Sequence, residues 1–290
     1  AKDLLPRLDD AILMRWFFVW DGKMSHMGRT AKGKKAAFKT AAALQPGEWT
    51  FVRDHTRDKA GSTQIFGSFF VRLAEGQMLA DARIFIPVRS AGVQFSGANA
   101  HLVIRNITAT HPYNDGFNIH GDCRDVVFEN IRAIECGDDG ISAHESAEYR
   151  VDGLVSIGNS TGITDTGTAK TTYRRVFLAD NLAFDLYFLN AGRYAVSDAV
   201  VLSSSEHSLH IAGGKDQRSE LRLDNVLIRR TGPTGSAAVA KDATLFARRF
   251  TIEGDKLKVD GKLDYDGSVA GRQELIESVV PAEYRSRLAQ

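Results

Sequence analysis

Short runs of alternating apolar and polar residues, separated by Gly, Asn and Asp, fill the chain from about residue 80 to about residue 255. The segment that begins at Leu102 (LVIRNITATHPYNDGFNIHG) matches, almost position by position, the segment that begins at Val126 (VVFENIRAIECGDDGISAHE). Alternation over four to six residues is the spacing of β-strands, whereas the i, i+3, i+4, i+7 spacing of helices is not sustained in this region. The pattern therefore predicts a repeat built from short strands.

The same pattern returns at roughly six or seven places, with a period of roughly 22 to 25 residues. Further copies, some of them degraded, start near Tyr149, Tyr173, Val196 and Leu221. A leucine-rich repeat would need a regular LxxLxL pattern, which is absent, and propeller blades are longer, at about 40 residues. We therefore predict an all-β fold, a single-stranded right-handed parallel β-helix (solenoid) whose coils stack about 4.8 Å apart.

Alignment of the copies also predicts which side chains stack on one another. Inward positions of successive coils should form ladders along the axis of the β-helix. Asn106 and Asn130 should form a ladder at a turn, because Asn tolerates left-handed backbone angles and its amide can bond along the stack. The predicted inward ladders are Leu102/Val126/Tyr149, Ile104/Phe128/Val151 and Ile107/Ile131/Leu154.

The two ends of the chain lack the repeat and are expected to cap the open ends of the stack. Residues 1–75, which are rich in Trp and Phe, should supply N-terminal strands and a cap, and residues 76–255 should form the coils. Residues 256–290 are expected to form a hairpin and a short helical tail, in which Pro281 can start a second helix. We expect a single domain, residues 1–290.

Charge and composition narrow the classes of partner. The formal net charge is +1, which argues against nucleic acid, and no run of roughly 18 apolar residues predicts a membrane span. The most basic stretch, Arg29 to Lys39, is expected to be a solvated loop or cap face, with a local anion patch as the alternative. Cys123 and Cys136 lack zinc spacing and are expected to be buried free thiols, a disulfide being the alternative.

The two best-matched copies carry an unusual number of acidic and polar side chains. Asp115 aligns with Asp139, and Asp138 precedes it directly, so the three carboxylates are expected to lie on neighbouring coils. Carboxylates at that separation interact, and the pKa of one should rise, as general acid–base catalysis on a glycosidic bond requires. The alternative is that each Asp only stabilises a strand-to-turn junction beside a Gly.

Polar side chains continue along the same predicted face and are expected to line a groove for an extended polymer. Within it, the aligned histidines of the two best copies could bind substrate hydroxyls, hold a metal or only cover a turn. Further candidates for the groove wall are Thr161, Thr164, Thr166, Tyr187, Asn190 and Lys215. The residues expected to bind substrate are Asn118, His120, His144, Glu145, Asp165, Asp185, Arg193, His207 and His210.

The string NDGFNIHG…GDDGISAHE resembles the centre of polygalacturonase-like glycoside hydrolases of the pectin lyase-like superfamily. Asn114-Asp115-Gly116 looks like their NTDG motif, and Gly137-Asp138-Asp139 looks like the GDD motif that follows about one coil later. The resemblance implies a right-handed parallel β-helix in which the three aspartates act in inverting hydrolysis. The β-helical α-galactosidases have a similar arrangement, with a lone Asp followed by an Asp-Asp pair.

This resemblance is good over residues of about 95 to 170 and elsewhere extends only to the repeat architecture. Two departures concern the substrate. The GHG motif of the polygalacturonases is not matched, because the corresponding position reads Thr161-Gly162. Their RIK motif, which grips the uronate carboxylate, has no match either. These departures put galacturonan specificity in question and weaken the inference of catalysis.

The sequence thus supports an inverting glycoside hydrolase that needs no cofactor, with carboxyl groups roughly 6.5–9.5 Å apart. One of Asp138 and Asp139 would be the general acid, and Asp115 with the remaining carboxylate would activate water. We expect the partner to be a polysaccharide or oligosaccharide, and the location to be secreted or periplasmic, although no signal peptide is visible at Ala1.

Two alternatives stay open. The first is a polysaccharide lyase for uronate polymers, in which the three aspartates would hold Ca²⁺ and His144, Arg193 or Lys215 would be the base. The second is a non-catalytic carbohydrate-binding β-helix that keeps the scaffold without the chemistry, because fold does not imply function.

Overall fold

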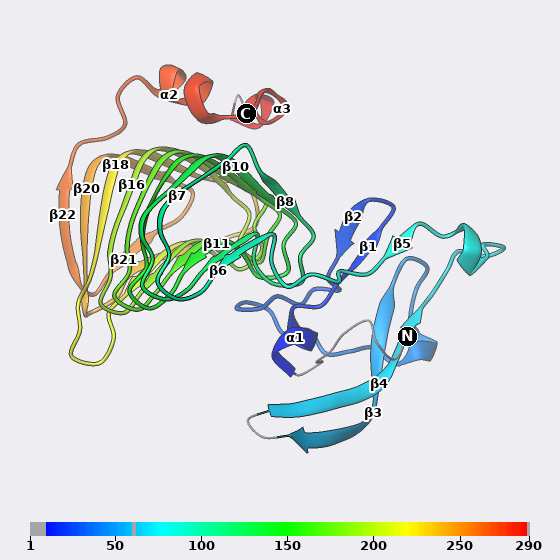
Figure 1. The fold of residues 1–290 in the computed structure, drawn as a ribbon. Helices are drawn as coiled ribbons and strands as arrows, with labels where there is room; N and C mark the ends of the chain where they lie inside the picture. Colours follow the sequence, from blue (N-terminus) through cyan, green and yellow to red (C-terminus); the bar gives the residue numbers. More distant parts are fainter. Residues whose placement is uncertain (1–9, 60–61, 289–290) are drawn as a thin grey trace.

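The protein is a parallel β-helix with an N-terminal unit on one side and a short helical tail packed against the coils (Figure 1). A computed structural model describes residues 10–59 and 62–288. The all-β solenoid predicted from the repeat is confirmed, including the short helical tail. Among the described residues, no helix combines the length and the apolar character needed to cross a bilayer.

Two parallel sheets run along the stack, and each coil contributes one strand to each of them. We call them the long-strand sheet and the short-strand sheet. The long-strand sheet contains β7 (Ala100–Arg105), β8 (Thr108–Thr110), β10 (Arg124–Ile134), β12 (Glu148–Ile157), β14 (Lys170–Ala179), β16 (Arg193–Ser203), β18 (Ser219–Arg230), β20 (Ala243–Glu253) and β22 (Lys262–Asp266). The short-strand sheet contains β6 (Val93–Phe95), β9 (Phe117–Ile119), β11 (Asp139–Ala143), β13 (Thr161–Asp165), β15 (Phe184–Leu189), β17 (His207–Ala212), β19 (Ser236–Val239) and β21 (Leu257–Val259).

The predicted ladders are confirmed by the strand register. Val126 pairs with both Leu102 and Tyr149, Phe128 pairs with Ile104 and Val151, and Ile131 pairs with Leu154. These side chains belong to the main hydrophobic core, except at the first coil, where Ile107 is 37% exposed because no coil covers it there. A continuous apolar core of this kind is the main source of stability in a solenoid.

A column of residues with left-handed backbone angles bends each long strand in its middle. Asn106 and Asn130 have φ of 59° and 50°, as the turn ladder predicted. The register skips this position, so the residues on either side of it pair on two differently oriented faces. Side-chain bonding along the column is present where Asn225 Nδ2 donates to Asp198 Oδ1 at 2.8 Å. The same position in the later coils is held by Gly153, Arg175, Asp198, Asn225 and Arg249.

The N-terminal unit has its own small aromatic core. Trp16, Phe18 and Trp49 are buried together, and Trp16 also packs against Tyr113 of the β-helix, with ring centroids 6.1 Å apart. The unit extends further than the predicted boundary at residue 75, because β5 pairs with β1 in an antiparallel sheet. Its elements are α1 (Asp10–Met14), β1 (Phe18–Trp20), β2 (Lys23–Ser25), η1 (Ala41–Ala43), the β3–β4 hairpin (Trp49–Lys59 and Ser62–Val71), η2 (Leu79–Asp81) and β5 (Ile84–Phe85).

The C-terminal segment differs from the expected hairpin. β21 and β22 each pair in parallel with the strand of the preceding coil, so residues 257–266 form a further coil. The helical tail follows, with α2 (Arg272–Val279), α3 (Ala282–Arg285) and η3 (Ser286–Leu288), and Pro281 stands directly before α3 as predicted. α2 lies over the long-strand sheet (Figure 1), and its Leu275 and Ile276 pack into an apolar cluster with side chains of that sheet. Cys123 and Cys136 are buried free thiols, as predicted.

Candidate active site

The three aspartates of the predicted site lie together where two neighbouring coils enter the short-strand sheet. Asp115 precedes β9, and Asp138 and Asp139 stand at the start of β11. One carboxylate oxygen from each residue lies within 4.8 Å of the others. We call these three residues the acidic cluster.

Glycine at the neighbouring position allows this close approach. Gly140 faces the interior, and a Cβ atom there would lie 2.1 Å from Ser156 Oγ and 2.6 Å from the carbonyl oxygen of Gly162. Only glycine therefore fits without a shift of the coil. Because Gly140 fills the inward position, Asp139 beside it faces outward, away from the core.

Hydrogen bonds fix the carboxylates in place. Asp115 accepts from the backbone N–H of Asp139 at 3.0 Å, from Ser142 Oγ at 3.0 Å and from Asn114 Nδ2 at 3.2 Å. Asp139 accepts from Thr164 Oγ1, one coil further along, at 2.7 Å. The acidic cluster is thus held rigidly by side chains of three successive coils, as a preorganised site requires.

Two cations from the N-terminal unit enter the acidic cluster. Lys32 Nζ donates to Asp139 Oδ1 at 2.6 Å and also to Asp138, and Arg15 Nη1 donates to Asp138 Oδ2 at 3.2 Å. The Lys32 side chain is 23% exposed and that of Asp139 only 3%, so the ion pairs are largely shielded from water. The Lys32 ammonium lies between Asp138 and Asp139, where any cation bound by both carboxylates would have to lie.

Lys32 is carried by residues 29–35, which we call the strap. The strap runs along the axis of the β-helix over the corners of four successive coils. The N–H of Ala31 donates to Ser160 Oγ at 3.1 Å, Gly33 lies against Ala183, and the N–H of Lys34 donates to Glu206 Oε1 at 2.9 Å. The prediction that Arg29 to Lys39 is a solvated loop or cap face fits the exposed Lys34, Lys35 and Lys39, but it is wrong for Lys32, which enters the acidic cluster.

The surroundings of the acidic cluster shift the pKa values of its three carboxyl groups in different directions. Burial would raise the pKa of Asp138, but the Lys32 ammonium and the Arg15 guanidinium outweigh it and lower the pKa below its ordinary value. Burial and the charge of Asp138 raise the pKa of Asp115 to about 7 and raise that of Asp139 well above its ordinary value. The charges of the three carboxylates in turn raise the pKa of Lys32 against the opposing effect of burial. The cluster therefore combines one carboxyl group of lowered pKa, Asp138, with two of raised pKa, Asp115 and Asp139.

The acidic cluster opens into a cavity of about 360 Å³. Three of the predicted substrate-binding residues also line it: Asn118, His120 and His144. The two imidazole rings stack with centroids 4.2 Å apart, and burial, followed by the neighbouring His120 and Lys32, lowers the pKa of His144 to about 4. His144 is therefore neutral at neutral pH and can donate or accept a hydrogen bond. The remaining lining residues are Arg15, Lys32, Asn114, Thr164, Thr166, Tyr187 and Leu189.

The other six predicted substrate-binding residues do not line this cavity, and Glu145, Asp165 and Asp185 are the first three of them. Glu145 is exposed and accepts a hydrogen bond from the N–H of Gly121 at 2.6 Å, so it stabilises a turn. Asp165 and Asp185 do not line a groove, because both side chains point inward and are fully buried. Asp185 is satisfied there by Asn181 Nδ2 at 3.0 Å and Ser205 Oγ at 2.8 Å, and burial raises its pKa to about 6.

Asp165 is the clearest of these corrections. Its carboxyl group accepts hydrogen bonds from the N–H of Ala143 at 3.0 Å, from Tyr149 at 3.2 Å, from Tyr173 at 2.9 Å and from Thr171 at 2.5 Å. Hydroxyl groups inside the coil thus replace water as hydrogen-bonding partners. Burial nevertheless raises the pKa of Asp165 to about 7.

The raised pKa of Asp165 makes a prediction about stability. The native state keeps a proton that the unfolded chain, with an ordinary pKa of 3.8, releases. The contribution of this group is therefore largest in acid and is lost as the pH rises toward 7. Relative to Asp165→Asn, the free energy of unfolding of the wild type should fall by about 3 kcal/mol between about pH 4.5 and about pH 7.5. Urea unfolding at several pH values measures this, with the exposed Asp264→Asn as control, for which the difference should stay constant.

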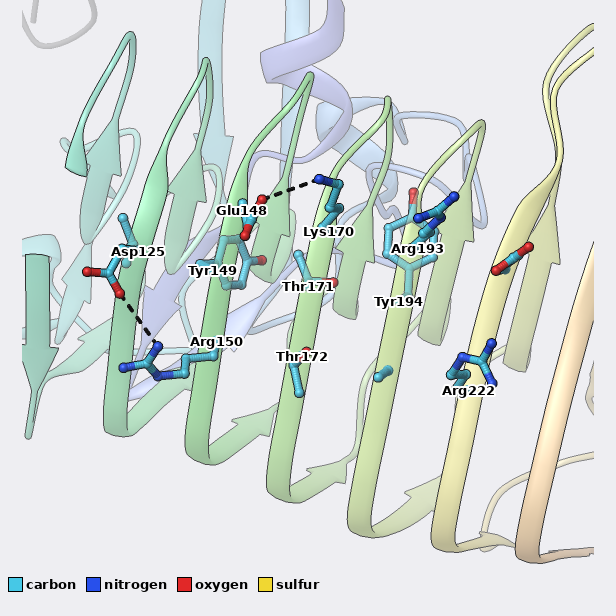
Figure 2. A pocket seen from close by; sticks show the side chains of 13 residues that line it. Asp125, Glu148, Tyr149, Arg150, Lys170, Thr171, Thr172, Arg193, Tyr194 and Arg222 are labelled. Carbon is cyan, nitrogen blue, oxygen red and sulfur yellow. Dashed lines mark hydrogen bonds and ion pairs between the residues drawn. The ribbon is translucent and has the colours of Figure 1, made fainter. Parts of the chain in front are cut away.

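Arg193 lies on a different surface. It lines a trough of about 560 Å³ on the long-strand sheet, together with Lys170 and Arg222 (Figure 2). Charges alternate in this trough, and Glu148 forms an ion pair with Lys170 at 3.5 Å. Successive strands display these side chains to solvent, and Arg193 does not line the cavity of the acidic cluster.

His207 and His210 lie near the cavity without lining it. They belong to β17 and contact two aromatic residues of β15, Phe184 and Tyr187, of which Tyr187 lines the cavity. We call these four residues the ring cluster. Phe184 and His207 stack with ring centroids 4.5 Å apart, and His207 Nδ1 lies 2.6 Å from Ser236 Oγ.

Arg15 and Lys32 are the site residues that the sequence reasoning missed. Both are far from the aspartates in the chain, and neither belongs to the repeat, so alignment of the coils carries no information about them. The density of basic residues around Lys32 was the available signal. Comparison of the chain with protein-family models, with curated proteins and with solved structures finds no match to any of them.

Proposed function

We propose that this protein is a carbohydrate-active enzyme, a glycoside hydrolase in which the acidic cluster performs acid–base catalysis. The observation that carries the proposal is the grouping of three carboxyl groups in one cavity, where Lys32 and Arg15 lower the pKa of Asp138 while burial and Asp138 raise the pKa of Asp139. Hydrolysis of a glycosidic bond needs a carboxylic acid that protonates the leaving oxygen and a carboxylate that activates water. Environments that push neighbouring pKa values apart supply both groups.

The assignment of roles follows from the cation positions. Lys32 and Arg15 keep Asp138 ionised, which suits a base. The raised pKa of Asp139 suits the general acid, and we assign Asp139 that role. Asp115 shares the cavity and supports the water beside Asp138. The non-catalytic alternative gives no reason for three carboxylates to lie so close together with such different pKa values.

The spacing bears on the stereochemistry. The nearest carboxylate oxygens are within 4.8 Å, closer than the roughly 6.5–9.5 Å expected for an inverting pair. The inverting separation expected from the sequence is therefore not met, and the spacing is nearer the roughly 5–5.5 Å of a retaining pair. We still propose attack by water, with inversion, because the resemblance of Asn114-Asp115-Gly116 and Gly137-Asp138-Asp139 to the NTDG and GDD motifs implies it. Proton NMR of the first product formed reports its anomeric form, and a retained configuration would contradict this part of the proposal.

The lyase alternative receives less support. The pKa of Lys32 is raised, so Lys32 stays protonated and cannot act as the base. Arg193 and Lys215 do not line the cavity of the acidic cluster. His144 remains as a neutral imidazole, but Arg15 and Lys32, the cations beside it, are paired with carboxylates and not available to a uronate.

A screen of the full chain on neutral and uronate polysaccharides tests the proposal. We expect new reducing ends without the ultraviolet absorbance of unsaturated uronides, and no change in rate when a chelator is added. Unsaturated products that disappear with chelator would establish the lyase instead. Absence of any new reducing ends over the whole panel would favour the non-catalytic alternative.

A further inference from the structure

The ring cluster lies next to the acidic cluster along the axis of the β-helix. Asp139 pairs with Thr161, Thr161 with Phe184, and Phe184 with His207. In the neighbouring outward column, Thr164 pairs with Tyr187. Phe184 therefore lies two coils, or about 10 Å, from Asp139 on the same face. Between them Thr161 is fully buried, and Thr164 lines the cavity.

The four rings form one continuous aromatic surface. Phe184 stacks on Tyr187 with centroids 4.1 Å apart and an interplanar angle of 22°, and His210 lies 5.4 Å from Tyr187. Phe184 and Tyr187 face away from the interior, and neither joins the apolar core of the coils. Phe184 is only 9% exposed because the other rings cover it, whereas Tyr187, His207 and His210 are partly exposed. Aromatic surface of this kind, beside a few polar groups, is typical of a ligand site.

The charges around this aromatic surface favour an uncharged sugar over a uronate. Burial lowers the pKa of both His207 and His210, so both rings are neutral at neutral pH. Among the residues that line the adjoining cavity, Arg15 and Lys32 are the permanent cations, and both are already paired with the acidic cluster. A uronate carboxylate would therefore find no free cation and would face the negative charge of Asp138.

We propose that the ring cluster is a saccharide subsite that binds the apolar face of an uncharged sugar unit, and that the substrate is a neutral glycan rather than a polyuronate. The sugar ring lies against Tyr187 and His210, and its hydroxyl groups reach Thr164 and Thr166 on the way to the acidic cluster. The glycan thus follows the helix axis across β11, β13 and β15. This inference rests on the proposed function, because it assigns the substrate of the same cavity.

Binding without turnover tests the subsite separately from hydrolysis. The probes are neutral oligosaccharides (glucan, galactan, xylan and mannan fragments) and oligogalacturonates, added to the full-length Asp139→Asn protein in a calorimetric titration. We expect at least one neutral series to bind and the oligogalacturonates not to bind. Tyr187→Ala should weaken binding of the neutral ligand about tenfold, and Tyr187→Phe should retain most of it, because the ring is what contacts the sugar.

The control is Tyr265→Ala, which removes a 51% exposed ring of β22 on the other sheet and should leave binding unchanged. Circular dichroism checks that each variant is folded. If Tyr187→Ala is not folded, His210→Ala replaces it as the ring variant. Equal or tighter binding of oligogalacturonates, no binding of any saccharide, or unchanged binding in both folded ring variants would overturn the subsite. Hydrolysis of a neutral glycan that is insensitive to the ring variants would overturn the subsite alone, whereas ring-dependent binding without hydrolysis by the wild type would overturn the hydrolase alone.

Discussion

Replacing Asp139 by Asn is expected to lower kcat about 10²- to 10⁴-fold on any glycan that the wild-type protein cleaves. Asn keeps an oxygen that can accept from Thr164 Oγ1 and from Lys32, so the fold should survive. It cannot supply the proton that the leaving oxygen needs. The limb of the pH–rate profile at which the general acid loses its proton should also disappear, because no group at position 139 then titrates.

Rates over a range of pH measure both effects. The matched control is Asp122→Asn, which removes an exposed carboxylate, 50% accessible, from the same part of the chain. A leaving group that needs no protonation, such as a fluoride, should restore much of the rate of Asp139→Asn. Full activity of Asp139→Asn on an ordinary glycoside would show that the acidic cluster is structural.

Replacing Lys32 by Met should lower the free energy of unfolding by about 3 kcal/mol at pH 8, the lower end of the range for breaking a buried ion pair. The change leaves Asp138 without its ammonium partner, while Met fills a similar volume. The loss should be smaller at pH 5, because without Lys32 the pKa of Asp138 rises and the carboxyl group takes up a proton. The acidic limb of the pH–rate profile should move to higher pH for the same reason.

Urea unfolding at the two pH values and the pH–rate profile check this prediction. Lys35→Met is the control, since it removes an exposed lysine from the same strap. An equal loss of stability for both variants, or a loss that does not depend on pH, would contradict the role of Lys32 as the counter-charge of the acidic cluster.

The sequence determined the fold and the core of the site because both repeat with the coils. Residues one period apart must stack in a parallel solenoid, so the alignment of Asp115 with Asp139 directly implied their proximity. The same reasoning implies that Asn118, His120 and His144 lie near the three aspartates, and all three line the same cavity. It did not separate inward from outward polar residues, and for that reason Asp165 was assigned to the groove. A carboxyl group can be buried where hydroxyl groups such as those of Tyr149 and Tyr173 donate hydrogen bonds to it. Because these hydroxyl groups come from different coils, the sequence of one repeat does not reveal them.

The strap could not be predicted from the repeat. Lys32 meets Asp138 across 106 residues of chain, and the docking of the N-terminal unit decides which coil receives the lysine. Periodicity has no bearing on such a contact. Arg193 does belong to the repeat, but its strand β16 lies in the long-strand sheet, whereas the acidic cluster lies at the short-strand sheet (Figure 2).

The path of the strap has a consequence for how the molecule unfolds. In an ordinary solenoid each coil contacts only its two neighbours, so the stack can fray coil by coil from either end. Here one segment bonds to coils as far apart as those of Asp138 and Glu206. Such a segment couples non-adjacent coils and makes them one cooperative unit. The coils that carry the acidic and ring clusters should therefore open together in hydrogen exchange, as the slowest block of the β-helix, while the coils beyond the strap exchange independently.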